Sequence, residues 1–111
     1  MDSRSTLKKN YEFRRLYDKG RSAATAYIVV YCRKNGSTQN RVGFTVSTKL
    51  GGAVVRNRVR RRLREIYRLS LDRLSPGLDM VVVARSRCVG AEYAQLEAAY
   101  IRACEKLGIM K

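Results

Sequence analysis

The stretch that decides the fold reads VVRNRVRRRLREIYR, from Val54 to Arg68, with seven arginines and a single acid, Glu65. An α-helix turns by about 100° per residue, which gives this stretch two chemically different faces. Roughly a third of the circumference is apolar and carries Val55, Val59, Leu63, Ile66, Tyr67 and, further on, Leu74. The opposite face carries Arg58, Arg61, Arg64 and Arg68, with Arg56 and Arg60 at the edges of the apolar stripe. The sequence therefore predicts a helix that docks on a protein core and presents its other face to an anionic partner.

The composition also points to a polyanionic partner. The chain of 111 residues fits one domain, residues 1–111, and its hydrophobic content of 45% supports a core. Lysine and arginine number 24 against nine acids, which gives a net charge of +15. Self-repulsion on this scale destabilises a compact chain unless a polyanion neutralises it. We therefore expect a single domain that binds a polyanion.

Periodicity and turn signals predict the elements around the arginine helix. Helices are expected over residues 10–19, with Asn10 as N-cap and Gly20 past the end, and over residues 92–107. Strands are expected over 27–33, 41–47 and 79–84, the first two joined as a hairpin at Asn35-Gly36. The arginine helix should run to about Leu74. This order predicts an α+β domain with helices packed on a small sheet.

Several classes of active site are excluded by the composition. Without histidine, the chain cannot form a Ser-His-Asp triad or a Cys-His pair. The acids are scattered, so no local carboxylate pair is set up for a catalytic metal, although distant acids can still converge. Cys32, Cys88 and Cys104 have no CxxC spacing, which indicates free thiols in a reducing cytoplasm. No apolar run reaches the roughly 18 residues of a membrane span. We expect a cytoplasmic protein without catalytic or metal-binding residues of its own.

Aromatic residues form a second group. Phe13 and Tyr17 are four residues apart, on one face of the first helix. Tyr27, Val29 and Tyr31 alternate on one face of the first long strand. Either set alone favours core packing, but together they suit a surface on which unpaired bases stack. This combination favours single-stranded RNA over duplex.

The segment RVGFTVSTKLGGAVVRNRVRRRLRE, residues 41–65, resembles the signature region of the bacterial ribonuclease P protein subunit, centred on Arg56-Asn57-Arg58. LKKNYEFRRLYDKG and DMVVVAR resemble the first helix and the late strand of that family, so the resemblance covers about residues 6–107. It implies a two-layer α/β sandwich like the second domain of ribosomal protein S5. Its small mixed sheet would contain a left-handed βαβ crossover, against the usual right-handed rule.

The resemblance also implies a function. Members of the family bind a catalytic RNA that removes the 5′ leader of precursor tRNA, using Mg²⁺ held mainly by the RNA. The chain would then be a subunit of the endoribonuclease ribonuclease P, monomeric within the holoenzyme and without a membrane partner. The RNA-facing positions would be Lys49, Arg56, Asn57, Arg58, Arg60, Arg61 and Arg64, with Arg68 next to them on the helix. The leader-binding cleft would be lined by Phe13, Tyr17, Val29 and Tyr31.

Two alternatives stay open on the sequence. One is a ribosomal or ribosome-associated RNA-binding module without a role in tRNA processing, since such modules share this fold class and this charge. The other is a protein-only nuclease whose acids converge from distant parts of the chain. Cleavage that survives removal of all RNA would favour the second.

Overall fold

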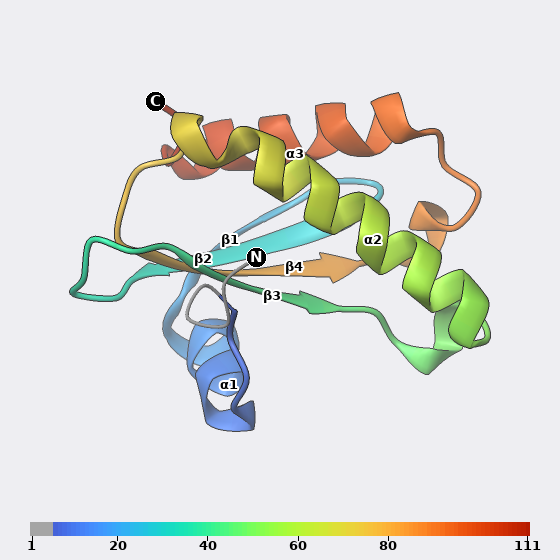
Figure 1. The fold of residues 1–111 in the computed structure, drawn as a ribbon, viewed down its shortest axis with the longest axis horizontal. Coiled ribbons are helices and arrows are strands. Elements are labelled where there is room, and N and C mark those ends of the chain that lie inside the picture. The colour runs from blue at the N-terminus through green and yellow to red at the C-terminus, as the bar shows by residue number, and fades with distance from the viewer. Residues whose placement is uncertain (1–5) are drawn as a thin grey trace.

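The computed structural model describes residues 6–111, which form three α-helices and four strands (Figure 1). The order is α1 (Asn10–Lys19), β1 (Arg21–Ala24), β2 (Ile28–Lys34), β3 (Arg41–Thr45), α2 (Ala53–Ser70), β4 (Leu78–Ala84) and α3 (Tyr93–Leu107). Single turns of 3₁₀ helix lie at Thr48–Leu50, Leu71–Arg73 and Ser86–Cys88. The strands form one mixed sheet in the order β1-β2-β4-β3. The predicted α+β class is confirmed.

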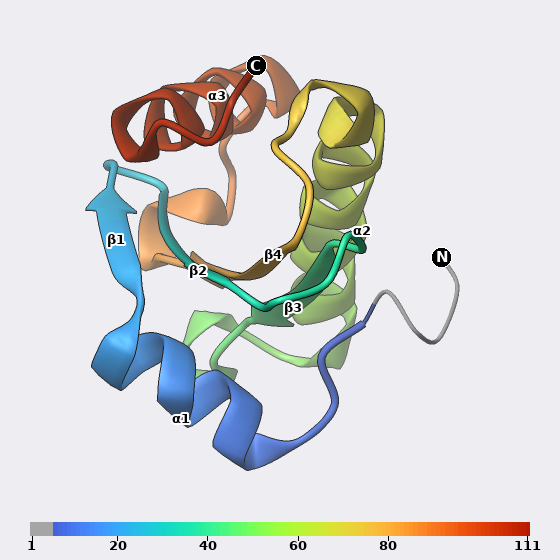
Figure 2. The same cartoon turned by 90° about the vertical axis from the view of Figure 1, so that its left-hand side faces the viewer.

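The helices cover the two faces of the sheet unequally (Figure 2). α2 and α3 pack side by side on one face, and the main core lies between them and the sheet. α1 crosses the other face alone, and Val29, Tyr31 and Val83 on that face are half-buried. The connection from β3 through α2 to β4 is left-handed, as the resemblance implied, and is an exception to the usual handedness of parallel crossovers.

The predicted hairpin between residues 27–33 and 41–47 is wrong. β2 pairs antiparallel with β1 and β4, and β3 pairs in parallel with β4, so β4 separates β2 from β3. Burial explains this order, because Met80, Val81 and Val82 of β4 are at most 1% exposed although they point alternately to both faces. An apolar strand of this kind is stable only in the centre of a covered sheet.

The edge strand β1 is the element that periodicity did not predict. Its sequence, RSAA, has small and polar side chains with low strand propensity, and only Ala23 is buried. It forms because β2 offers a free edge, on which Arg21 pairs with Cys32 and Ala24 with Val29. Pairing with β2 thus stabilises β1, although the sequence of β1 has low strand propensity.

Two predicted helix ends are shifted. Lys9 is the N-cap of α1 and Asn10 is its first helical residue, because Glu12 accepts hydrogen bonds from the backbone N–H groups of Lys8 (3.1 Å) and Lys9 (3.0 Å). α2 ends at Ser70, and the 3₁₀ turn Leu71–Arg73 leads on to Leu74. Within residues 6–111 no helix is both long and apolar enough to cross a membrane.

Candidate nucleic-acid interface

On the outward face of α2, three of the predicted arginines have no partner among residues 6–111. The helix is fixed on the sheet by three side chains that are at most 4% exposed, Val59, Leu63 and Ile66. Arg58, Arg61 and Arg64 consequently face solvent, and none of them forms an ion pair within residues 6–111. Like charges at this spacing repel one another in a free helix and become favourable beside phosphates. We call these three residues, with Lys49, Arg56, Asn57, Arg60 and Arg68, the arginine face.

Other members of the arginine face are held at its border. Arg56 is half-buried, and its Nε donates to the carbonyl oxygen of Gly51 (3.2 Å). Arg60 is also half-buried, and its guanidinium donates to Oδ1 of Asn57 (3.2 Å). Lys49 is exposed on the 3₁₀ turn that precedes the helix. These bonds orient Arg56 and Arg60 at the edge of the apolar stripe, where the periodicity predicted them.

Two arginines of α2 have protein partners that the sequence did not reveal. Arg68 forms two hydrogen bonds with the carboxylate of Glu65, at 3.1 and 2.6 Å, so its charge is partly neutralised. Arg62 donates to the carbonyl oxygen of Ala91 (2.9 Å) and ties the helix to the loop before α3. The free charge of the arginine face is therefore concentrated near its centre, away from Arg68.

The predicted aromatic residues meet on the opposite face of the sheet. The rings of Tyr17 and Tyr31 are 5.0 Å apart and nearly perpendicular, at 76°. The hydroxyl of Tyr17 lies 2.8 Å from Oγ1 of Thr45 on β3. Phe13 lies against Gly43, where a Cβ atom would come within 2.5 Å of the ring. Only glycine at this strand position lets α1 approach the sheet so closely. We keep the name aromatic cleft for the surface that the four predicted side chains, Phe13, Tyr17, Val29 and Tyr31, present on the α1 side of the sheet.

These side chains are partly accessible, and Phe13 and Tyr31 also pack against the small buried cluster of Leu7, Leu16 and Val81. Phe13, Val29 and Tyr31 are half-buried, and Tyr17 is 40% exposed. Aromatic rings that are fixed but still accessible can stack on unpaired bases. Tyr27, which the sequence placed with Val29 and Tyr31, packs instead against the main core on the other face, because it lies outside β2.

An ion-pair network that the sequence did not predict fixes α1 on the sheet. Arg41 of β3 donates twice to Asp79 of β4, at 2.8 and 2.7 Å, and once to Glu12 of α1, at 2.7 Å. The carboxylate side chains of Glu12 and Asp79 are only 12% and 15% exposed. The hydrogen bonds that Arg41 donates to Asp79 raise the pKa of Arg41. Burial by itself would raise the pKa of Glu12, but the N–H groups of Lys9 and Lys8 and the charge of Arg41 outweigh it and lower that pKa.

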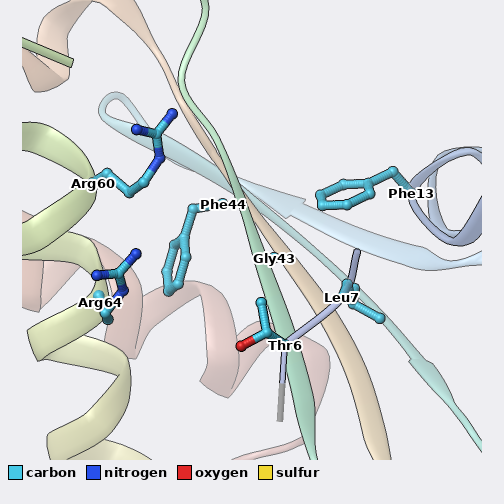
Figure 3. A pocket seen from close by; sticks show the side chains of 7 residues that line it. All are labelled: Thr6, Leu7, Phe13, Gly43, Phe44, Arg60 and Arg64. Carbon is cyan, nitrogen blue, oxygen red and sulfur yellow. The ribbon is translucent and has the colours of Figure 1, made fainter. Parts of the chain in front are cut away.

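A cavity of about 380 Å³ connects the two surfaces around the edge of β3 (Figure 3). It is lined by Thr6, Leu7, Phe13, Gly43, Phe44, Arg60 and Arg64. Figure 3 shows Phe13 on one side of the strand and Phe44, Arg60 and Arg64 on the other. Of the described residues before α1, Leu7 pairs with the start of this edge, where its N–H donates to the carbonyl oxygen of Val42 (2.9 Å). The cavity is thus bordered by Phe13 of the aromatic cleft and by Arg60 and Arg64 of the arginine face.

The acids and thiols of the described residues do not gather around a common point. Among residues 6–111, no three His, Cys, Asp or Glu side chains come close enough together to hold a metal ion. Burial raises the pKa values of the Cys88 and Cys104 thiols to about 11, so both are protonated at neutral pH. What the described residues do provide is guanidinium groups for phosphates and rings for bases.

The chain matches the family Ribonuclease P over residues 1–108. It is 41% identical over 110 residues to the ribonuclease P protein component of Alkaliphilus oremlandii, covering 99% of this chain and 96% of that protein. It is 43% identical over 106 residues to that of Natranaerobius thermophilus, covering 96% and 92%. The solved structure of the Staphylococcus aureus RNase P protein superimposes with a TM-score of 0.88 at 30% identity, over 96% of this chain and 98% of that one. The RNase P protein from Thermotoga maritima gives 0.80 at 29% identity, over 87% and 92%.

Proposed function

This chain belongs to the ribonuclease P protein family, and we propose that it binds two RNA segments on two separate surfaces. As a member of the family it is the protein subunit of a ribonucleoprotein endonuclease that removes the 5′ leader of precursor tRNA, and RNA carries the catalysis. The arginine face binds the catalytic RNA, and the aromatic cleft binds the single-stranded leader. The observation that carries this proposal is the separation onto opposite faces of one sheet of accessible rings and of guanidinium groups that have no ion pair among the described residues.

At the arginine face, the contacts are made mainly to the phosphate backbone. Arg58, Arg61 and Arg64 have no acidic partner among the described residues, so each can donate to phosphate oxygens with its full charge. The half-buried Arg56 and Arg60 are already oriented by protein hydrogen bonds and lose less side-chain freedom on binding. The remaining contacts are Lys49, Asn57 and Arg68.

In the aromatic cleft, binding depends on stacking. Tyr17 and Tyr31 are held edge to face, and Phe13 and Val29 complete an apolar surface beside them. Bases in a duplex are already stacked on one another, so only an unpaired segment can use such a surface. Family members act on precursor tRNA, whose leader is such a segment, and we propose that this leader occupies the cleft.

We also propose that the Mg²⁺ ions of the reaction are held mainly by the RNA, and that the protein acts as a monomer within the holoenzyme. A cytoplasmic location suits its three free, buried thiols. The ribosomal alternative has no support among the matching proteins named above.

The test is cleavage of precursor tRNA by the cognate catalytic RNA at low Mg²⁺ concentration, with and without the purified protein. We expect the protein to stimulate this cleavage strongly and to cleave nothing alone, because its role is to hold both RNAs together. Absence of stimulation would overturn the proposal. Cleavage by RNA-free protein would replace it with the protein-only nuclease.

A further inference from the structure

The cavity around the edge of β3 combines positive charge with an aromatic ring. The guanidinium groups of Arg60 and Arg64 are four residues apart in α2, so they lie on one side of the helix. The ring of Phe44 lies on their side of β3 (Figure 3). None of the described residues that line the cavity is acidic. The arginine face has no other aromatic residue next to its charges, which makes this position different from the rest of the face.

The ring of Phe44 is only partly used by the core. Phe44 is half-buried and packs edge to face on Tyr67, with ring centres 6.3 Å apart and an angle of 84° between the planes. Among residues 6–111, guanidinium groups lie over the rings of Tyr11 and Tyr27 only, so no arginine covers the ring of Phe44. A ring that is held by the core and still borders a cavity can stack on an unpaired base.

The edge of β3 also presents backbone hydrogen-bonding groups. β4 pairs with one edge of β3, and on the other edge the carbonyl oxygen of Val42 accepts from the N–H of Leu7 (2.9 Å). Alternate residues of a strand direct their N–H and C=O groups to the same edge, so those of Phe44 point the same way as those of Val42. The chain leaves this edge after Leu7, because the N–H of Lys9 donates to Glu12 of α1. One donor and one acceptor of Phe44 are therefore left without a strand partner in the described part of the chain.

We propose that this cavity binds one unpaired nucleotide of the catalytic RNA, with its base against the Phe44 ring and its phosphate between Arg60 and Arg64. The N–H and C=O of Phe44 suit the Watson–Crick edge of such a base, which carries donors and acceptors. The volume of about 380 Å³ lies in the range of roughly 300–1,000 Å³ that is typical of small-ligand sites, so it suits a nucleotide and not a duplex. This inference rests on the proposed function, since it takes the catalytic RNA as the ligand of the arginine face.

The position of Phe44 favours the catalytic RNA over the leader as the source of this nucleotide. Arg60 and Arg64 belong to the arginine face, and Phe44 lies on their side of β3. Phe13 of the aromatic cleft also lines the cavity, but it lies on the other side of the strand (Figure 3). The base contact therefore belongs to the RNA that binds α2.

The experiment uses the reconstituted holoenzyme with precursor tRNA. Dimethyl sulfate and a carbodiimide modify the Watson–Crick edges of unpaired bases, and both RNAs are probed with and without saturating protein. The unmodified protein should protect an unpaired base of the catalytic RNA, and Phe44→Leu should leave that base reactive. Phe44→Leu should also weaken binding of the catalytic RNA about tenfold, the effect of one lost stacking contact. Its salt slope should not change, because no phosphate contact is lost.

The matched control for Phe44→Leu is Tyr27→Leu. Tyr27 is also half-buried and packed against the main core, but it does not line the cavity. Its RNA affinity and its protected base should match those of the unmodified protein. If Tyr27→Leu exposed the same base, loss of core packing would explain the effect and the proposal would be rejected. Urea denaturation of both variants checks that they fold.

Two exposed arginines test the site without changing the core. Arg64→Gln and Arg61→Gln each remove a cation that has no ion pair among the described residues, and each should lower the salt slope by about 0.9. Only Arg64 lines the cavity. At saturating protein, the base should therefore become reactive in Arg64→Gln and stay protected in Arg61→Gln. Equal protection in the two variants would overturn the proposal, whether or not Phe44→Leu folds.

The unmodified protein separates this failure from failure of the proposed function. If its affinity for the catalytic RNA did not depend on salt, the arginine face would not bind that RNA, and both proposals would fall. If it binds as expected but protects no unpaired base, or if the base stays protected in Phe44→Leu, only the nucleotide site is overturned. The same holds if the base that Phe44→Leu exposes lies in the leader of the precursor tRNA, because the leader would then be the occupant.

Discussion

The arginine face and the aromatic cleft are both expected to bind RNA, but they are built in opposite ways. The arginine face lies mainly on one helix, α2, and depends on periodicity within a single segment. The cleft is assembled from α1, β2 and β3 and depends on contacts between distant segments, such as Tyr17 with Thr45 and Arg41 with Glu12. A single helix can therefore present a row of charges. A surface for stacking, in contrast, requires several elements to be held at a fixed distance from one another. Changes at the two sites should therefore have separable effects.

The largest effect is expected from Arg61→Ala combined with Arg64→Ala. Loss of two phosphate contacts should weaken binding to the catalytic RNA about tenfold to a hundredfold and lower the salt slope by about 1.8, through lost counterion release. Titration of the RNA at several salt concentrations measures both quantities. Arg87→Ala with Arg102→Ala is the matched control and should leave the slope almost unchanged. The two surfaces would not be separate if this variant lost its preference for precursor over mature tRNA to the same degree as its affinity for the catalytic RNA.

The next effect is expected from Arg41→Gln, which leaves the carboxylates of Glu12 and Asp79 without their cation. The free energy of unfolding should fall by about 2 kcal/mol, less than the loss for a fully buried pair, because the Arg41 side chain is 34% exposed. Urea denaturation measures it. The preference for precursor tRNA should fall as well, because α1 is no longer fixed.

Binding of the catalytic RNA is a second measurement on Arg41→Gln. The affinity of this variant for the catalytic RNA should equal that of the unmodified protein, because the arginine face does not include the ion-pair network. Arg68→Gln, which breaks the exposed pair with Glu65, is the control and should leave the urea midpoint unchanged. Loss of both RNA affinities in Arg41→Gln would show that the surfaces are not independent.

A smaller effect is expected from Tyr17→Ala or Tyr31→Ala. Each should weaken binding of precursor relative to mature tRNA by about 1–2 kcal/mol, the value of one lost stacking contact. Tyr17→Phe keeps the ring and loses only the hydrogen bond with Thr45, so its affinity should stay near that of the unmodified protein. If Tyr17→Phe were as weak as Tyr17→Ala, the hydroxyl and not the ring would hold the leader.

The smallest effect is expected in the pH dependence of the free energy of unfolding, through Glu12 of α1. The pKa of Glu12 is lowered in the folded protein, so its ionised form stabilises the fold above the ordinary value of 4.5. This contribution is lost as the pH falls through the lowered pKa. Glu12→Gln should therefore be less stable by about 1 kcal/mol at neutral pH and lose less stability than the unmodified protein on acidification. Urea midpoints measured across the acid range test this, and parallel curves for the two proteins would contradict it.

Sequence reasoning succeeded where structure is local. It predicted α2 with its buried Val59 and exposed Arg61, because a helical period is set by the geometry of one segment. It also predicted that Phe13 and Tyr17 share one side of α1. It failed for the hairpin, since the turn signal at Asn35 says where a strand ends but not which strand pairs next.

The parts of the interface that were missed involve residues far apart in the chain. Arg41 and Asp79 stand near the starts of two apolar strands, and only the parallel pairing of β3 with β4 brings them opposite one another. Strand order also explains why Phe44 lines the cavity. β3 is an edge strand next to α2, which the sequence did not predict. A search for unlike charges at the starts of predicted strands could have suggested the first pair.

By itself, the sequence determined that this protein has a basic helix with an apolar anchor, a small α+β core and no histidine chemistry. Only the tertiary structure decided the strand order, the cleft beneath α1 and the cavity that joins it to the arginine face. The physical reason is the range of the interactions. Helical periodicity is fixed within a few residues, whereas strand pairing is chosen by which apolar strand must be buried on both faces.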